Sequence, residues 1–120
     1  MGNLIEEKSF NFAVKIVSLC KDLRNQGVER DLIRQILCSG TSIGANIAEA
    51  QQAQSNADFI SKMNIALKES AETNYWIRLF KASGFLPDDI ANQLLDECSQ
   101  IEKILSSIIR SAKGKKQIAV

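Results

Sequence analysis

The chain has 120 residues, of which 45% are hydrophobic and 24% charged, and its 15 Lys and Arg side chains nearly balance 14 Asp and Glu. This length and composition predict one globular domain of ordinary size. A net charge of +1 gives no general case for nucleic-acid binding by charge alone. The absence of histidine excludes Ser-His-Asp and Cys-His catalytic systems and removes the most common metal ligand.

The first predicted helix spans residues 6–26 and carries two neighbouring apolar rows. Both rows have the three- and four-residue steps of a helix face, so we expect both to face the core. Gly27 is suited to the left-handed conformation that ends a helix. The rows are Phe10, Ala13, Val17, Cys20 and Leu23, and beside them Phe12, Ile16 and Leu19.

The second predicted helix, over residues 29–53, is rich in small side chains and poor in charge. Ile33, Ile36, Ile43 and Ile47 follow helical spacing with Gly40 and Gly44 among them. Glycine costs about 1 kcal/mol relative to alanine inside a helix, so close packing must offset the cost. Glu49 is the only charged residue from position 35 to 57. This pattern fits a central bundle helix, or a bundle helix that also forms a subunit interface.

The last two predicted helices span residues 57–83 and 88–112. The former has a heptad-like row typical of bundle packing, and the latter begins after Pro87 and has a similar row. Residues 113–120 form a basic tail that we expect to be flexible. The two rows are Phe59, Met63, Ala66, Ser70, Thr73, Ile77 and Phe80, then Ile90, Leu94, Cys98, Ile101, Leu105 and Ile108.

These four helices and their short connections predict an all-α fold, an antiparallel up-down-up-down four-helix bundle, as a single domain over residues 1–112. The three cysteines, Cys20, Cys38 and Cys98, are expected to be buried reduced thiols. The N-terminal residues do not resemble a signal peptide, and no apolar run approaches the ~18 residues that span a membrane. We therefore expect a cytoplasmic protein without a membrane partner.

Few residues remain that could support chemistry, and we expect no catalytic, metal or cofactor site. Asn46 and Glu49 share a helix face, where Asn46 is expected to fix helix register and Glu49 to pair with it or with a cation. Glu69 and Glu72 are expected to be surface charges or intersubunit pairs. Tyr75 and Trp76 either belong to the core or an interface, or they stack on nucleic-acid bases. Lys113, Lys115 and Lys116 are either solvated lysines or contacts to phosphate.

Several motifs together resemble a known bacterial family. Residues 41–50 (TSIGANIAEA) resemble the signature of the four-helix-bundle proteins encoded in intervening sequences of 23S rRNA genes. Residues 8–13, 58–60, 68–73 and 75–79 agree with the same family, and the similarity spans residues 5–109. Ala50 stands where many relatives have glycine.

The resemblance implies an antiparallel four-helix bundle that assembles into a homo-oligomeric ring, a pentamer, without catalytic activity. A related group, the accessory proteins of diversity-generating retroelements, uses a strongly basic ring to bind nucleic acid and a reverse transcriptase; this chain lacks that charge excess. Our first hypothesis is a non-enzymatic homo-oligomeric binding or scaffold protein. The alternative is an RNA-binding protein associated with ribosomal RNA or a reverse transcriptase, and the sequence names no protein partner.

Overall fold

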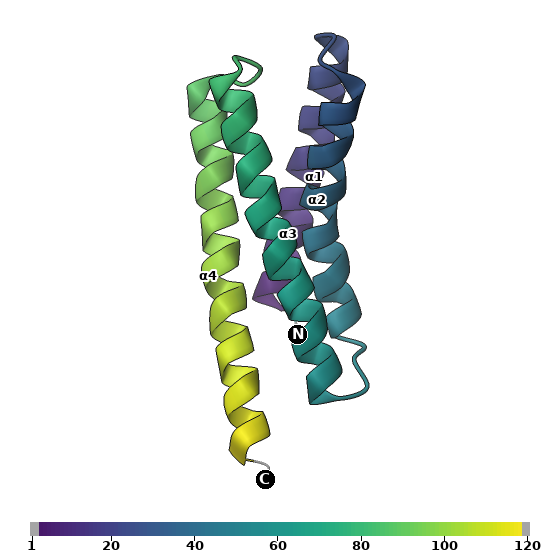
Figure 1. Ribbon diagram of the computed structural model, residues 1–120, viewed down its shortest axis with the longest axis vertical. Coiled ribbons are helices and arrows are strands. Elements are labelled where there is room, and N and C mark those ends of the chain that lie inside the picture. The colour runs from purple at the N-terminus through teal and green to yellow at the C-terminus, as the bar shows by residue number, and fades with distance from the viewer. Residues whose placement is uncertain (1–2, 119–120) are drawn as a thin grey trace.

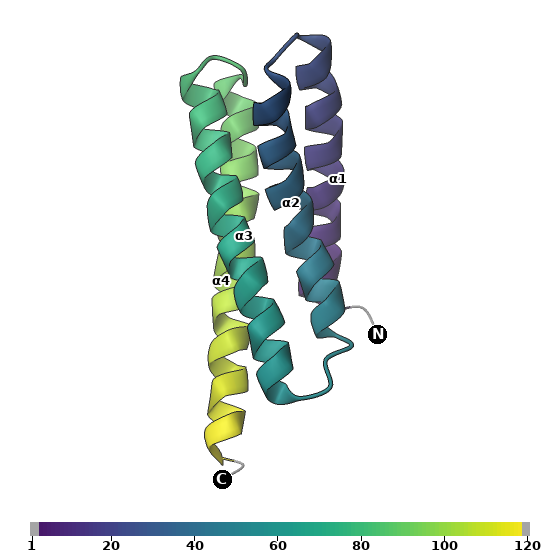
Figure 2. The same cartoon turned by 45° about the vertical axis from the view of Figure 1, so that its right-hand side comes forward.

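The computed structural model describes residues 3–118, with side chains through residue 114. It consists of four helices, α1 (Leu4–Asn25), α2 (Arg30–Ala50), α3 (Asn56–Ala82) and α4 (Asp88–Ile118), and no strand occurs in the described range. Figures 1 and 2 show that consecutive helices run in opposite directions along the long axis of the molecule. The predicted all-α four-helix bundle is confirmed.

Glycines end two helices, and the sequence prediction for Gly27 is confirmed. Gly27 and Gly84 have φ values of 77° and 80°, which other residues rarely adopt. After α3, the amide of Phe85 donates to the carbonyl of Phe80 at 2.9 Å, and their rings pack edge to face with centroids 5.9 Å apart. This is a Schellman motif with its apolar contact, and it fixes where α3 stops.

The helices form a ring of neighbours, α1–α2–α3–α4, in which α1 and α4 also touch. The contact between α1 and α4 is the least extensive of the four. Within the described residues, no Cα atom of α1 lies within 8 Å of one in α3, and the same holds for α2 and α4, so each of these pairs is diagonal. The outward faces of α1 and α3 therefore point to different sides of the bundle.

The predicted core rows of the two middle helices are confirmed. In α2, Ile33, Ile36, Gly40, Ile43 and Ile47 are buried. In α3 the whole predicted row from Met63 onward is buried, and Phe59 at its start is half-buried against the core. α1 and α4 supply the rest of the core, whose buried apolar residues include Ile5, Phe12, Ile16, Leu23, Leu94, Ile101 and Leu105.

The prediction for the outer helices needs correction. In α1 the row beginning at Phe10 is buried only at its C-terminal end, at Cys20 and Leu23. Phe10 and Val17 are exposed and Ala13 is half-buried. In α4, Ala91 and Ile109 take the core positions predicted for Ile90 and Ile108; Ile90 is exposed and Ile108 half-buried. α1 packs against α2 and, much less extensively, against α4, so it buries one of its two apolar rows and exposes part of the other.

The helix boundaries differ from the predicted ones by up to three residues, except at the end of α4. This helix continues through Gly114 to Ile118, six residues past the predicted end at 112. Its C-terminal end runs beyond the α2–α3 connection in Figures 1 and 2. The prediction of a flexible tail also covers Ala119 and Val120, which lie outside the described residues.

The three cysteines are free thiols, but they are not all buried as predicted. Cys38 is exposed on α2, whereas Cys20 and Cys98 are buried. Burial raises the pKa of Cys20, an effect that nearby Arg24 opposes. Burial, and secondarily the Glu102 carboxylate, raises the pKa of Cys98 to about 12. The Cys98 thiol donates to the carbonyl of Ser70 at 3.1 Å.

A Cys38→Ser variant should therefore show no reactive thiol in its native state. Both remaining thiols are buried and protonated at neutral pH, and the thiolate is the reactive form. Titration with a chromogenic disulfide reagent at pH 8 should detect no reactive thiol before unfolding in guanidinium and two thiols afterwards. Rapid native-state reaction of one thiol would contradict the burial of Cys20 or Cys98.

Candidate functional site: the α1/α2 groove and the outer face of α3

The two glycines of α2 allow α1 to approach closely. A Cβ atom on Gly40 would lie 2.9 Å from both γ-carbons of Ile16, closer than real carbon atoms pack. A Cβ atom on Gly44 would lie 3.4 Å from the backbone carbonyl oxygen of Ser9. At Gly44 the approach is thus to the backbone of α1, and at Gly40 it is to a branched core side chain.

Asn46 and Glu49 do not act as a pair. The Asn46 amide donates to the carbonyl of Ser42 at 2.8 Å, within its own helix. That bond joins no two helices, so the predicted register role of Asn46 is not supported by it. Glu49 instead accepts from the Lys62 ammonium at 3.2 Å, linking α2 to α3. This ion pair is largely exposed, so its stabilisation is small.

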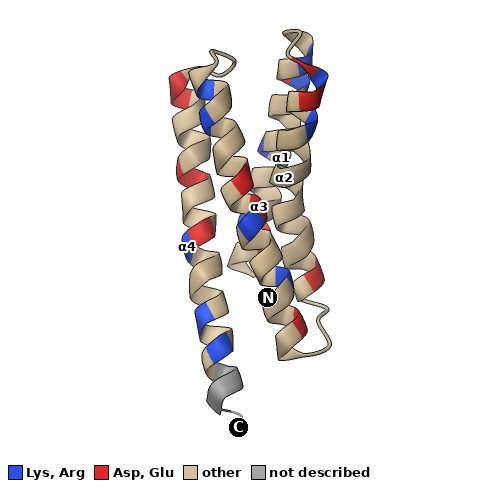
Figure 3. Cartoon of the chain, in the orientation of Figure 1, with Lys and Arg blue, Asp and Glu red and all other residues tan. Residues whose placement is uncertain are grey.

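A shallow groove runs between α1 and α2, with a volume of about 300 Å³. We call it the α1/α2 groove, and its lining residues are Glu6, Phe10, Ala13, Thr41, Gly44, Ala45 and Ala48. Phe10 is 67% exposed at its edge, and Val17, one turn beyond Ala13, is 41% exposed. Figure 3 shows the long uncharged stretch of α2 between the charged residues near its two ends.

On α3, three of the predicted interface residues share a flank. Glu72 accepts from the indole N–H of Trp76 at 3.2 Å. Burial raises the pKa of Glu69, with the Glu72 carboxylate adding to the effect and Lys68 opposing it. Glu69, Glu72 and Trp76 are half-buried. These three side chains therefore pack at the surface of their own bundle.

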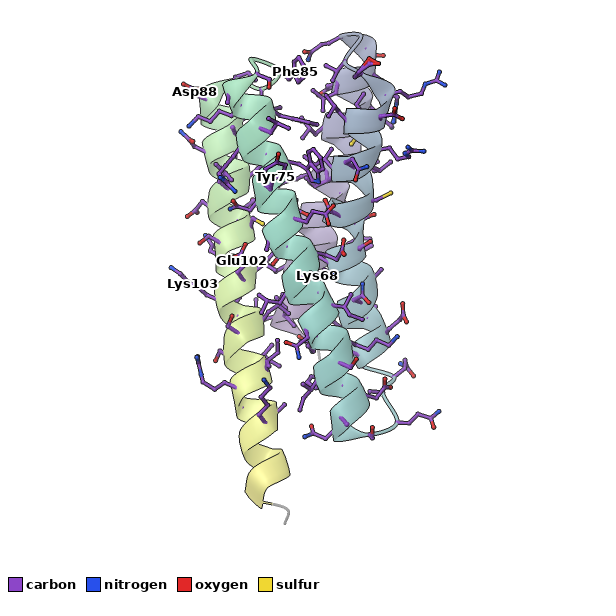
Figure 4. The ribbon with its side chains drawn as sticks, viewed as in Figure 1. Lys68, Tyr75, Phe85, Asp88, Glu102 and Lys103 are labelled. Atoms are coloured by element: carbon purple, nitrogen blue, oxygen red, sulfur yellow. The ribbon has the colours of Figure 1, made fainter. Side chains whose placement is uncertain are left out.

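Tyr75 differs from these three because it points outward. It is 49% exposed, its ring meets that of Trp76 edge to face at 5.0 Å, and the Arg78 guanidinium lies 5.9 Å from its ring centre. Figure 4 shows Tyr75 and Lys68 on the same helix, α3. We call the exposed side of this helix the α3 outer face, made of Ser61, Asn64, Ile65, Lys68, Ala71, Tyr75 and Arg78.

The C-terminal half of α4 is basic. From position 103 onward the sequence has five cations and no acid, namely Lys103, Arg110, Lys113, Lys115 and Lys116. Lys103, Arg110 and Lys113 are exposed. Ser99, Ser106, Lys103 and Arg110 line a polar hollow of about 450 Å³ beside Leu67 and Glu102. For Lys115 and Lys116 the backbone is helical, and their side chains lie outside the described residues.

The described residues contain no group of three or more Cys, Asp or Glu side chains arranged to hold a metal ion. None of the helices within residues 3–118 is long and apolar enough to cross a membrane. The features that stand out chemically are apolar and steric. They are the α1/α2 groove on one side of the bundle, which has Glu6 as its one charged lining residue, and the exposed side of α3 on another, which carries Ile65 and Tyr75.

Sequence reasoning singled out Tyr75 but missed the other exposed apolar residues of the two surfaces. Phe10 and Val17 were predicted as core, and Ile65 was not singled out. One signal could have separated the rows of α1. The buried row alternates four- and three-residue steps over the whole helix and consists of Ile5, Ser9, Phe12, Ile16, Leu19 and Leu23. The row of Phe10 begins later and covers only residues 10–23.

Comparisons with known proteins agree on the family. The family model described as 23S rRNA-intervening sequence protein matches residues 3–107. The chain is also similar to a crystal structure from Bacteroides thetaiotaomicron, described as a protein with unknown function from the S23 ribosomal protein family. That similarity has 50% identity and a TM-score of 0.85, covering 88% of this chain and 97% of the other. No curated protein matches. The chain therefore belongs to the 23S rRNA-intervening sequence protein family.

Proposed function

We propose that the protein is a non-enzymatic, homo-oligomeric helical bundle of the cytoplasm that serves as a binding or scaffold module. The observation that carries this proposal is the α1/α2 groove, where apolar and small side chains face outward on a helix with almost no charge. Contiguous apolar surface of this kind is typical of protein interfaces. The family resemblance supports a ring of five subunits as the proposed assembly.

The non-enzymatic part of the proposal rests on the chemistry of the residues. The sequence has no histidine. Cys98, with a pKa of about 12, stays protonated at neutral pH and is a poor nucleophile. Glu49 and Glu72 are each engaged by a neighbouring side chain. These carboxylates are accounted for by packing and pairing, without a catalytic role.

Light scattering coupled to size-exclusion chromatography tests the assembly directly. We expect a particle of five times the 13.3 kDa chain mass, stable on dilution into the low micromolar range. A mass of one chain at micromolar concentration would contradict the proposal. A stable particle with a different multiple of the chain mass would support an oligomer but contradict a pentamer.

A second candidate function is RNA binding through the basic half of α4. The observation that favours it is the run of five cations without an acid after Glu102, on a helix that extends past the α2–α3 connection. In an oligomer these cations would be repeated in every subunit, which raises avidity for a polyanion. The partner would be an RNA phosphate backbone, such as that of ribosomal RNA or of an RNA bound by a reverse transcriptase.

Filter binding of 23S rRNA fragments at low salt tests this second function. We expect the triple variant Lys103→Gln, Arg110→Gln, Lys113→Gln to lower the affinity and to reduce the salt dependence of binding. A control that removes three exposed cations elsewhere, Lys21→Gln, Arg24→Gln and Arg30→Gln, should have a smaller effect. Equal losses in both variants, or no retention of RNA by the wild type, would reject a specific role for α4.

A further inference from the structure

We propose that the α3 outer face of one copy packs into the α1/α2 groove of the next copy, so that each subunit uses two different faces. This inference rests on the proposed homo-oligomer and names the surfaces that form it. The occupant of the groove is a second copy of this chain. The placement of the two faces, their heights along the bundle, and their shape and charge support this pairing.

The two faces can be used at the same time. α1 and α3 are diagonal, and within residues 3–118 none of their Cα atoms lie within 8 Å of each other. Their exposed sides therefore point away from one another, and a neighbour on one side leaves the other free. Contacts between unlike faces are heterologous, and they close into a ring when the rotation between copies permits it.

The heights of α1 and α3 can be compared through α2, which contacts both. Glu49 is paired with Lys62, so these two residues lie at similar heights. Gly44 lies five positions before Glu49, and because α3 is antiparallel the same height on α3 is five positions after Lys62, at Leu67. Gly44 packs beside Ser9. Ser9 on α1 is therefore level with Leu67 on α3.

A second contact gives an alignment that differs from the first by three positions. Gly40 packs against Ile16. It lies nine positions before Glu49, the residue that pairs with Lys62. Because α3 is antiparallel to α2, the same height on α3 is nine positions after Lys62, at Ala71. Ile16 on α1 is therefore level with Ala71 on α3.

The exposed apolar residues of the two faces occur at matching heights. By these alignments Phe10 is level with position 68 of α3 and Val17 with position 72. Ile65 thus lies three positions before the first of these and Tyr75 three positions after the second, in each case about 4.5 Å and less than one helical turn. Rotation about an axis along the bundle leaves height unchanged. Ile65 of one copy then reaches Phe10 of the next, and Tyr75 reaches Val17.

Shape and charge are also complementary. The groove is lined mainly by small side chains, including Ala13, Ala45 and Ala48, which leave room for a helix to approach. The α3 outer face presents Ile65 and Tyr75, which are 39% and 49% exposed. Its charged residues, Lys68 and Arg78, are both positive, and Glu6 is the charged residue of the groove. A helix laid in a groove is a common mode of recognition.

The other apolar surface of α1 serves as a matched control. Val14 is 54% exposed, but it lines a hollow between α1 and α4 together with Lys8, Asn11, Lys15 and Glu97. Lys15 and Glu97 form an ion pair across that hollow. The surroundings of Val14 are thus more polar than the α1/α2 groove, and no residue of the proposed interface lies there.

Three single variants and one mixture test the proposal by light scattering. Phe10→Glu and Ile65→Glu should each lose the wild-type oligomer and elute with the mass of one chain. Val14→Glu should keep the wild-type mass. Because each of these residues is exposed, all three variants should keep the helical circular dichroism of the wild type.

The mixture distinguishes unlike faces from like ones. Phe10→Glu keeps an intact α3 outer face and Ile65→Glu keeps an intact groove, so one good interface forms between them. Mixing them at high concentration should give a one-to-one dimer that grows no further. Failure to form this dimer would overturn the pairing of these faces.

The remaining outcomes separate the two proposals. A wild type that is monomeric rejects the oligomer itself. A wild-type oligomer whose mass is unchanged in both Phe10→Glu and Ile65→Glu keeps the proposed function and overturns the inferred faces. Loss of the oligomer in Val14→Glu to the same extent as in Phe10→Glu would also overturn the choice of groove.

Discussion

A Gly40→Leu variant should lose about 3 kcal/mol of unfolding free energy or more, and its Tm should fall by about 10–15 °C. Even a methyl group at this position would meet both γ-carbons of Ile16 at 2.9 Å. Ile16 is fully buried and branched at its β-carbon, so it cannot swing away without disturbing its neighbours. Denaturant unfolding followed by circular dichroism measures the loss.

A second substitution at the same contact tests the cause. Ile16→Ala alone should cost about 2–5 kcal/mol by leaving a cavity. In the Gly40→Leu background it should cost much less, because the shortened side chain makes room for the leucine. The double-mutant cycle should therefore show a coupling energy beyond additivity. Additive costs would mean that the clash with Ile16 does not explain the loss.

Gly44→Ala provides the matched glycine control. Its new methyl group would lie 3.4 Å from the carbonyl oxygen of Ser9, at the edge of ordinary contact. Alanine gains up to about 1 kcal/mol over glycine in a helix interior. We expect the unfolding free energy to change by no more than about 1 kcal/mol, with the helix gain opposing the tight contact. A loss as large as that of Gly40→Leu would contradict this distinction.

Phe12→Ala should cost about 3–5 kcal/mol, whereas Phe10→Ala should cost the folded subunit no more than about 1 kcal/mol. The two residues are two positions apart on α1, with Phe12 2% exposed in the core and Phe10 67% exposed at the groove edge. Removing a buried ring leaves a cavity in the core, whereas the space of an exposed ring is filled by water. Unfolding of both variants in an Ile65→Glu background compares them in one oligomeric state.

The same pair separates folding from assembly. Phe12→Ala should lower the stability at every protein concentration. Phe10→Ala should weaken the oligomer on dilution while leaving the monomer stable. If Phe10→Ala destabilised the monomer as much as Phe12→Ala, the outer row of α1 would belong to the core after all.

The sequence by itself determined the helix content, the helix order and most of the boundaries. These features depend on local chemistry, such as the left-handed φ of Gly27 and Gly84 and the side-chain oxygen of Ser55, which accepts from the amide of Asp58 at 3.0 Å. The buried rows of α2 and α3 were also predicted, because each of these helices has one dominant apolar row. For α4 the row was offset at its two ends, where alanine and isoleucine neighbours compete.

The candidate site was only partly predictable. The resemblance and the lack of charge on α2 indicated an interface, and Tyr75 is on the proposed outer face. Asn46 was predicted to join helices, but its amide bonds to its own helix through Ser42. A sequence gives the donors and acceptors of a side chain, and the partner that is closest depends on the three-dimensional packing.

Only the tertiary structure decided which apolar residues of α1 are buried. Phe10 and Phe12 are equally apolar in the sequence, and both rows have helical spacing. α1 contacts α2 and α4 and is diagonal to α3, so it has neighbours on one side only. The sequence thus determined that α1 is a helix with a wide apolar surface, whereas the number and position of its neighbours decided that Phe12 builds the core and Phe10 remains on the surface.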